Sequence, residues 1–433
     1  TGLVAVAGVV VLLGNAFGLF GRSTPGASTG CVAGPAVRFG HEGAVAYVKG
    51  DSLHLLEFQS RRDRVLVAHG VHRPVRWSWD GTWIAFQDAD GTVAVVPAGG
   101  GPACQPLGGN VQAWAWSPVR TYLVGVTAGG GLVRGGPDQK PKFLLPNGWG
   151  VSGSPSFDSS GKSVAVQAEH PSPGAAGVFV NIWTIEVRTA RPHEVFRVPA
   201  NIATDMAVAG WSSDGSWVLF WAGSRRLGGF DELPLEAVRL SGEQPVQIVS
   251  AMLVHTELLT WCGNRLVVVA GGGREITLQK KLVIAQPPDW SAVPVSSQLG
   301  STQSAFWPSC SSPFGKLVAA SVGPSRSSVS PLDTRWALWL VQPQGSIGGP
   351  TTDPGPGFSD EAPRWSRDGT SVLFVRRAVG TTNGQLYVLT PTSPGQGLGK
   401  VTGPIADLAS YPDTDGYIPW SGGFDWYQPR GNR

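Results

Sequence analysis

Short runs of alternating character, each ended by a turn, repeat along most of the chain. Residues 83–87 are an example, with Trp, Ala and Gln on one side and Ile and Phe on the other, as the two faces of a β-strand require. Ser, Asp and Gly precede such runs and favour tight turns. A third run, as at 92–97, and a more exposed fourth, as at 64–68, complete a unit. The pattern predicts units of four short antiparallel strands.

One phrase marks these units. RWSWDGTWIAF at residues 76–86 returns as GWSSDGSWVLF at 210–220 and as RWSRDGTSVLF at 364–374, with weaker copies between and before them. Alignment of the copies places one large aromatic residue at the end of each first strand. These anchors are Phe39, Trp77, Trp116, Phe157, Trp211, Trp261, Trp307 and Trp365. Successive anchors lie 38 to 58 residues apart, the length of a four-stranded propeller blade with insertions in the later blades.

The repeat therefore predicts an all-β fold, a single β-propeller of four-stranded antiparallel blades. Eight blades are preferred and seven are the alternative. The anchors are expected to pack between neighbouring sheets, because a large aromatic side chain buries about 150–250 Å². Turn residues are expected to shape the hairpin after each anchor: Asp80, Gly81, Asp214, Gly215, Asp368 and Gly369. Both sets are interpreted as packing and turn residues rather than as a site.

The motif W-S-x-D-G-x-x-[V/I]-x-F, followed by a turn and an [I/L]-[Y/W]-V strand, resembles the WD-like repeat of TolB-type β-propellers. A similar repeat occurs in the propellers of prolyl oligopeptidase and dipeptidyl peptidase IV relatives. The resemblance covers about residues 35–402 and is strongest in the copies at Trp77, Trp211 and Trp365. It implies an extracytoplasmic, bacterial, membrane-anchored propeller. TolB has a separate N-terminal domain and a six-bladed ring, so its own partners and role are not implied here.

The two ends differ from the repeats. Residues 2–20 carry no charged side chain, and about 19 or 20 such residues can just cross a bilayer core. We predict a transmembrane anchor or signal segment at 1–21, with a buried strand or helix as the alternative. A linker at 22–34 and the propeller at 35–402 follow. The tail at 403–433 is rich in Tyr and Trp, and we expect it to dock on the ring because exposed aromatic patches are unfavourable.

Composition narrows the class of protein. The 433 residues include 60 Gly, 35 Pro and 18 Trp but only 2 Met, which suits strands and turns and argues against a helical bundle or a disordered chain. The net charge of +3 gives no reason to expect nucleic acid. Four cysteines, none in a C-x-x-C, favour disulfides outside the cytoplasm. The preferred pairs are Cys31–Cys104 and Cys262–Cys310, with free buried thiols as the alternative.

The residues predict no catalytic, cofactor-binding or metal site. No G-x-S-x-G elbow is present. His255 is the last histidine, so the C-terminal part of the sequence cannot supply the histidine of a Ser-Asp-His triad in that order. His69 and His72 form H-x-x-H without a third ligand nearby. The D-x-D-G stretch at 88–91 is interpreted as a hairpin turn. For the second D-x-D-G stretch, at 413–416, a weak calcium site remains an alternative. Glycine triplets occur at 99–101, 129–131 and 271–273. They lack the Lys-[Ser/Thr] of a P-loop and are interpreted as loops between strands.

Together these features predict a non-catalytic extracytoplasmic propeller, monomeric and held at the membrane by its N-terminal segment. Its expected partner is a protein, peptide or glycan of the cell envelope. Two alternatives remain. One is the sensor domain of a longer membrane receptor, and the other is a propeller enzyme, a lyase or hydrolase, with its site at the channel mouth. A channel lined by three or more histidines or carboxylates would favour the enzyme.

Overall fold

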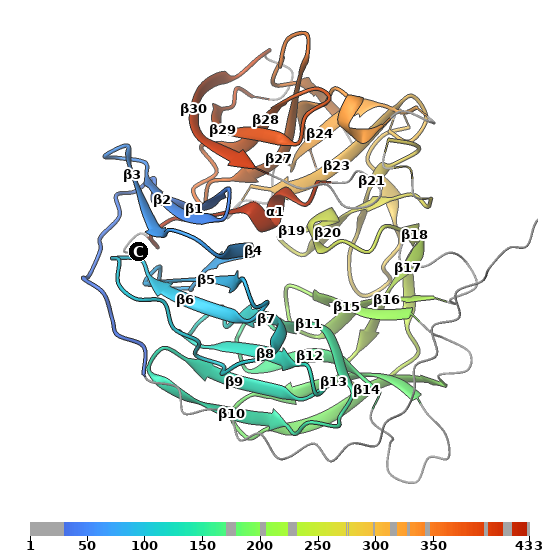
Figure 1. Ribbon diagram of the computed structural model, residues 1–433. Helices are drawn as coiled ribbons and strands as arrows, with labels where there is room; N and C mark the ends of the chain where they lie inside the picture. The colour runs from blue at the N-terminus through green and yellow to red at the C-terminus, as the bar shows by residue number, and fades with distance from the viewer. Residues whose placement is uncertain are drawn as a thin grey trace, which may run out of the picture.

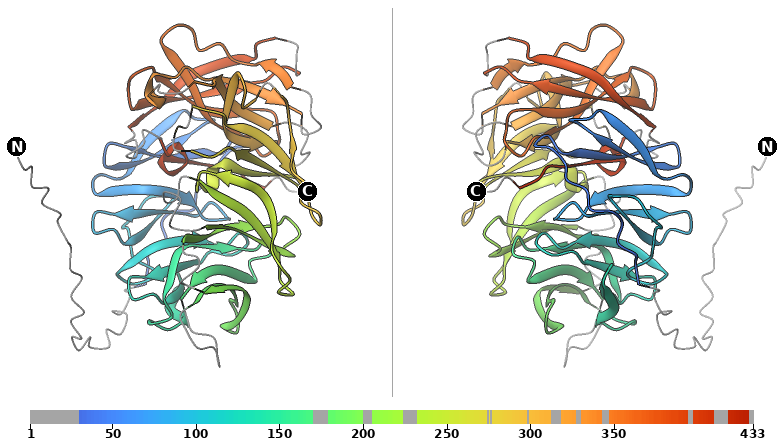
Figure 2. Two further views of the ribbon diagram at one scale, coloured as in Figure 1. Left: turned by 90° about the vertical axis from the view of Figure 1, so that its right-hand side faces the viewer. Right: turned by 90° about the vertical axis from the view of Figure 1, so that its left-hand side faces the viewer.

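The structure, a computed structural model, is a ring of β-sheets. It describes residues 30–169, 179–199, 205–223, 232–273, 275, 277–297, 299–311, 318–326, 330–342, 347–393, 397–409 and 418–430. Eight sheets follow one another around the ring in chain order, as the colours of Figure 1 show. In the side views of Figure 2 the blue N-terminal sheet lies next to the red C-terminal ones. The predicted eight-bladed β-propeller is confirmed.

Each blade runs outward from an inner strand at the ring centre. Blade 1 contains β31 (Phe424–Tyr427), β1 (Ala44–Lys49), β2 (Ser52–Glu57) and β3 (Arg62–Val67). Blade 2 contains β4 (Val71–Trp77), β5 (Trp83–Asp88) and β6 (Val93–Pro97). Blade 3 contains β7 (Val111–Trp116), β8 (Leu123–Thr127), β9 (Leu132–Gly136) and β10 (Gln139–Leu145). Blade 4 contains β11 (Val151–Phe157), β12 (Ser163–Ala168), β13 (Phe179–Glu186) and β14 (Arg191–Pro199).

The second half of the ring repeats this order. Blade 5 contains β15 (Asp205–Trp211), β16 (Trp217–Gly223), β17 (Leu233–Arg239) and β18 (Val246–Met252). Blade 6 contains β19 (Leu259–Cys262), β20 (Arg265–Ala270), β21 (Lys281–Ala285) and β22 (Val293–Pro294). Blade 7 contains β23 (Gln303–Cys310), β24 (Val318–Pro324), β25 (Ala337–Val341) and β26 (Ile347–Pro350). Blade 8 contains β27 (Phe358–Trp365), β28 (Val372–Ala378), β29 (Asn383–Thr390) and β30 (Lys400–Ala409). The described helices are short: η2 (Thr256–Leu258), η3 (Pro331–Asp333) and α1 (Trp420–Gly423).

Blade 2 has three strands instead of four, and a disulfide covers its outer edge. A single bridge between Val95 and Cys104 stands where the fourth strand would lie. Cys104 is bonded to Cys31, with 5.6 Å between the Cα atoms, and Cys262 is bonded to Cys310 across blades 6 and 7. Both expected disulfides are therefore present.

The Ser-x-Asp-Gly turn is held by hydrogen bonds within itself. After β4, Ser78 Oγ donates to Asp80 Oδ1 at 2.7 Å and accepts the backbone N–H of Trp83 at 3.0 Å. Gly81 has a φ of 70°, in the left-handed region that favours glycine. The same bonds recur in blades 5 and 8, around Asp214 and Asp368. These residues occupy the turns that the repeat predicts.

Anchor indoles join neighbouring blades as well as filling space between them. Trp77 Nε1 donates to the carbonyl of Asp425 at 3.0 Å, and Trp116 Nε1 donates to that of Arg76 at 3.1 Å. Trp211 Nε1 donates to the carbonyl of Ser156 at 2.9 Å. In each case the acceptor lies on the inner strand of the preceding blade. Tryptophan, rather than any large apolar residue, is favoured at these anchors because its N–H reaches across the seam.

Trp116→Phe should lower the free energy of unfolding by about 1 kcal/mol more than Trp365→Phe does. Trp116 loses its bond to the carbonyl of Arg76, whereas Trp365 Nε1 is buried without a partner among the described residues. Both changes remove the same atoms, so the difference isolates the bond between blades. Urea unfolding of the two variants measures it. Equal losses would contradict this role of the anchor indole.

The ring is closed by the C-terminus, which corrects the alignment at its first copy. Phe39 precedes β1 and lies in no strand. The inner strand of its blade is β31, in which Trp426 pairs with Val45 and Tyr427 with Ala44. Phe39 instead packs edge-on against Trp77, with ring centroids 5.6 Å apart. The motif of blade 1 is thus divided between the two ends of the chain.

A second correction concerns blade 7. Cys310 pairs with Val318, as Trp365 pairs with Val372 in the next blade, so Cys310 holds the anchor position. Trp307 lies within the register shift of β23, with a φ of 48°, and is buried. The motif pointed to Trp307 because the anchor position of this blade carries a disulfide cysteine instead of an aromatic residue.

The predicted limits of the segments also need adjustment. The ring does not end at residue 402, because β30 continues to Ala409 and β31 follows later. The expected membrane segment at 1–21 and the possible calcium loop at 413–416 lie outside the described residues. In the part of the chain that is described, no helix is long and apolar enough to cross a membrane.

Candidate functional site

The C-terminal segment crosses the centre of the ring. α1 lies in the middle of the ring in Figure 1, and β31 follows it directly. The carbonyl of Ser421 accepts a hydrogen bond from Arg76 of blade 2 at 2.6 Å, and its Oγ donates to Glu257 in η2, just before blade 6. Blades 2 and 6 face each other across an eight-bladed ring. The segment therefore links opposite sides of the ring.

A buried ion pair fixes this segment to blade 8. Glu361 Oε1 accepts from Arg377 at 2.7 and 3.0 Å, and Glu361 Oε2 accepts from the indole N–H of Trp420 at 2.6 Å. Both charged side chains are 1% exposed. The remaining guanidinium donors of Arg377 bind the carbonyls of Leu332 and Thr381, at 2.7 and 3.2 Å. We interpret this fully hydrogen-bonded pair as stabilising the fold, because removal of one partner would leave an uncompensated charge in the interior.

The neighbouring carboxylate is held in the same way. Asp360 receives two bonds from Arg376, from Nε at 2.7 Å and from the second guanidinium nitrogen at 2.9 Å. Burial raises the pKa of Asp360, and the Arg376 guanidinium opposes that rise. Arg376 in turn lies over the Tyr387 ring, 5.1 Å from its centroid. This carboxylate is therefore held by an arginine of its own blade and by Thr352, which follows β26 of blade 7.

Two arginines stand at the repeat position just before an anchor, Arg76 in β4 and Arg364 in β27. Burial and the charge of Arg76 lower the pKa of Arg364, while the charges of Glu257 and Asp425 oppose this change. Asp425 Oδ2 also accepts the backbone N–H of Trp77 at 2.8 Å. The equivalent residues of blades 3 to 7 are small: Ala115, Ser156, Gly210, Thr260 and Ser309. The charged groups near the centre are thus concentrated around the closing segment, which consists of α1 and β31.

The remaining candidates from the sequence do not converge. The described residues contain no group of three or more His, Cys, Asp or Glu that could hold a metal ion. His69 lies 3.8 Å from Asp51, both exposed, and His72 lies on β4. The backbone carbonyls of residues 271–273 accept hydrogen bonds from the buried Lys280 Nζ, with N···O distances of 2.7–3.2 Å. This glycine triplet therefore faces a cation. A phosphate cradle would present N–H groups instead.

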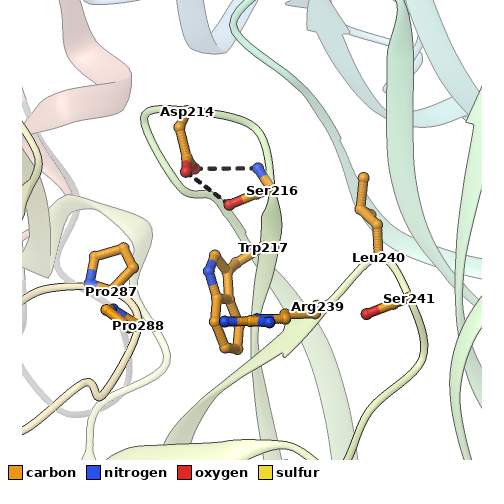
Figure 3. Close-up of a pocket in the computed structure, with 8 residues that line it drawn as sticks. All are labelled: Asp214, Ser216, Trp217, Arg239, Leu240, Ser241, Pro287 and Pro288. Carbon is orange, nitrogen blue, oxygen red and sulfur yellow. Dashed lines mark hydrogen bonds between the residues drawn. The ribbon is translucent and has the colours of Figure 1, made fainter.

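An open cleft of about 510 Å³ lies between blades 5 and 6. Its lining comes from the turn after β15, the end of β17 and the segment after β21: Asp214, Ser216, Trp217, Arg239, Leu240, Ser241, Pro287 and Pro288. Figure 3 shows Asp214 bonded to Ser216 above Trp217, with the two prolines across the cleft. The volume suits a small ligand or a short length of an extended chain.

Charge and an aromatic ring meet inside this cleft. The Arg239 guanidinium lies over Trp217, 4.9 Å from the ring centroid, and 3.5 Å from Glu243. Hydrogen bonds from Ser212 and Ser216 hold the pKa of Asp214 below its usual value. The sequence identified Asp214 only as a turn residue. It gave no local signal for the cleft, because the prolines that face it belong to the next blade.

The comparisons with known proteins concern the fold. No protein-family model matches this sequence, and no curated protein matches it either. Among solved structures, dihydro-heme d1 dehydrogenase NirN in complex with DHE is 15% identical, with a TM-score of 0.52, over 86% of this chain and 77% of that one. The fold is an eight-bladed β-propeller. An oligogalacturonate lyase in complex with manganese is 13% identical, with a TM-score of 0.50, over 82% of this chain and 99% of that one.

TolB structures are also among the matches. TolB from Acinetobacter baumannii is 14% identical, with a TM-score of 0.35, over 84% of this chain and 66% of that one. At such identities the likeness to solved structures concerns the fold alone, since one propeller fold serves many functions.

Proposed function

We propose that this chain is a non-catalytic β-propeller that binds a protein partner at the cell envelope. The observation that carries the proposal is the use of the ring centre by the chain itself. The carboxylates there are engaged in closing the ring, as in the bonds of Glu361 to Trp420, of Glu257 to Ser421 and of Asp425 to the backbone of Trp77. Because these carboxylates are engaged in closing the ring, we expect a partner to bind on the faces of the ring instead of at its centre.

Two disulfides support a location outside the cytoplasm, because structural disulfides form in oxidising compartments. The uncharged run at 2–20 would tether the propeller to the membrane. Such a tether would hold the faces of the ring close to other envelope proteins and raise their effective concentration.

The cleft between blades 5 and 6 is the proposed contact with the partner. It offers an apolar wall at Pro287 and Pro288, an acceptor at Asp214 and a donor at Arg239. An extended peptide segment presents apolar side chains and backbone groups in alternation, which suits this arrangement. We therefore propose an extended segment of a protein as the ligand of this cleft.

Selection of displayed random peptides on the purified protein tests the proposal. Selected peptides should bind Arg239→Ala at least about tenfold more weakly than the parent chain, because a charge-assisted hydrogen bond is lost. Ser241→Trp, which fills the cleft, should have the same effect, and Arg326→Ala on another blade should have none. Peptides that bind all variants equally would contradict the site. Turnover of polygalacturonate or of a prolyl peptide, lost in Glu257→Gln, would contradict the non-catalytic assignment.

A further inference from the structure

A second cleft, of about 620 Å³, lies at blade 7. It is formed at the start of β23, the end of β24 and the start of β25, where Gln303 pairs with Pro324 and Val322 with Ala337. The first cleft lies at the opposite strand ends, at the start of β16 and the end of β17. The two clefts therefore open on opposite faces of the ring.

The lining of the second cleft combines a half-buried aromatic ring with hydrogen-bonding groups. Val322 and Ala337 form an apolar base next to Trp339. The polar part consists of Thr302, Gln303, Asp333 and Thr334, together with Arg326 and Arg335. An apolar surface surrounded by several donors and acceptors matches a sugar, which has an apolar ring face and a belt of hydroxyl groups.

One polar group in this wall lacks a partner. Gln303 Oε1 is buried and accepts no hydrogen bond from the described residues. A buried acceptor without a donor is unfavourable, and most native structures avoid it. The terminal torsion of glutamine is broad, so a modest rotation turns the amide toward a ligand. A hydroxyl group entering the cleft would supply the missing donor.

The two arginines of the cleft differ in their charge balance. Arg335 is paired with Asp353, so its charge is already compensated. Arg326 is exposed, and its guanidinium has no hydrogen bond or ion pair within the described part of the chain. Its backbone is held by Thr277, which donates to its carbonyl at 2.9 Å and accepts from its N–H at 3.2 Å. The exposed guanidinium of Arg326 is therefore the cationic group of the cleft that is open to a carboxylate ligand, whereas the carboxylate of Asp333, which lines the same cleft, would repel such a ligand and must lie away from it.

We propose that the cleft at blade 7 binds an acidic saccharide. The sugar ring would lie on Trp339, a hydroxyl group would donate to Gln303, and the carboxylate would bind Arg326. This site is separate from the peptide cleft between blades 5 and 6, and it involves no chemical step.

Calorimetric titration of the full chain with a trisaccharide of galacturonic acid and with the matched trisaccharide of galactose tests the proposal. The acidic sugar should bind at least about tenfold more tightly than the neutral one. Arg326→Ala should remove that preference, and Gln303→Ala should weaken both sugars. Arg239→Ala, the same change in the other cleft, should leave both affinities as they are. Each proposal can therefore fail while the other holds.

Several outcomes would overturn the assignment. Equal affinity for the two sugars would exclude recognition of the carboxylate, and an unchanged preference in Arg326→Ala would place it elsewhere. Absence of binding at roughly 10 mM sugar would exclude the site, since that is weaker than any specific association expected here. An acidic dipeptide that competes as well as the sugar would assign the cleft to peptide instead.

Discussion

Replacement of Glu361 by leucine should lower the free energy of unfolding by about 3–5 kcal/mol, the range for breaking one side of a buried ion pair. The change would leave the Arg377 guanidinium without a counter-ion at a position that is 1% exposed. It would also remove the acceptor of the Trp420 indole N–H, which holds the closing segment to blade 8. Urea unfolding of the variant and the parent chain measures the loss.

A compensated variant separates the buried charge from the shape of the site. Glu361→Leu combined with Arg377→Met and Trp420→Phe removes the charge together with the donors of Arg377 and Trp420. Among the described residues it leaves only the hydroxyl of Ser359 without its acceptor. Because an apolar replacement of a buried pair is often close to neutral, this triple variant should be more stable than Glu361→Leu alone. If the triple variant is no more stable than the single one, the ion pair is not what holds the closing segment.

Loss of the Cys262–Cys310 disulfide should lower the free energy of unfolding by about 4 kcal/mol. The bond closes a loop with a sequence separation of 48, and the estimate is the loop entropy that the unfolded chain regains. It also joins the inner strands of blades 6 and 7, where β19 is only four residues long. Comparison of Cys262→Ala/Cys310→Ala with the parent chain in urea, without reductant, measures the effect.

A reductant provides the control for this second prediction. Dithiothreitol should destabilise the parent chain at least as much as the double substitution does, because it opens both disulfides. It should have a smaller further effect on the double variant, in which only Cys31–Cys104 remains. A double variant as stable as the oxidised parent chain would show that the bond contributes nothing to the ring.

An anchor residue can be placed from the sequence only where the residues of its motif are contiguous along the chain. The anchors at Trp77, Trp211 and Trp365 were correctly placed because motif, turn and strand are contiguous within one blade. Phe39 and Trp307 were misplaced because the local motif is incomplete there. In blade 1 the inner strand comes from the other end of the chain, and in blade 7 a cysteine replaces the aromatic residue.

The clefts were beyond the reach of the same reasoning. Pro287 and Asp214 line one cleft but belong to different blades, and neither has a neighbour in sequence that marks it as part of a site. The ion pair of Glu361 with Arg377 is similar, since two charged residues on paired strands resemble an exposed pair until burial is known. Both features depend on burial and on contacts between residues that are far apart in the sequence.

The amino-acid sequence by itself determined the all-β class and the repeated four-stranded units, with eight preferred over seven, because hydrophobic alternation, turn chemistry and repeat spacing are local properties. It favoured the two cysteine pairs that the structure contains, with free thiols as the alternative. Only the tertiary structure decided how the ring closes and where it is hollowed. β1 and β31 come together from the two ends of the chain, the first cleft lies between blades 5 and 6, and the second is formed by strand ends of blade 7. Contacts of that kind follow from the geometry of eight sheets around one axis, which no single repeat contains.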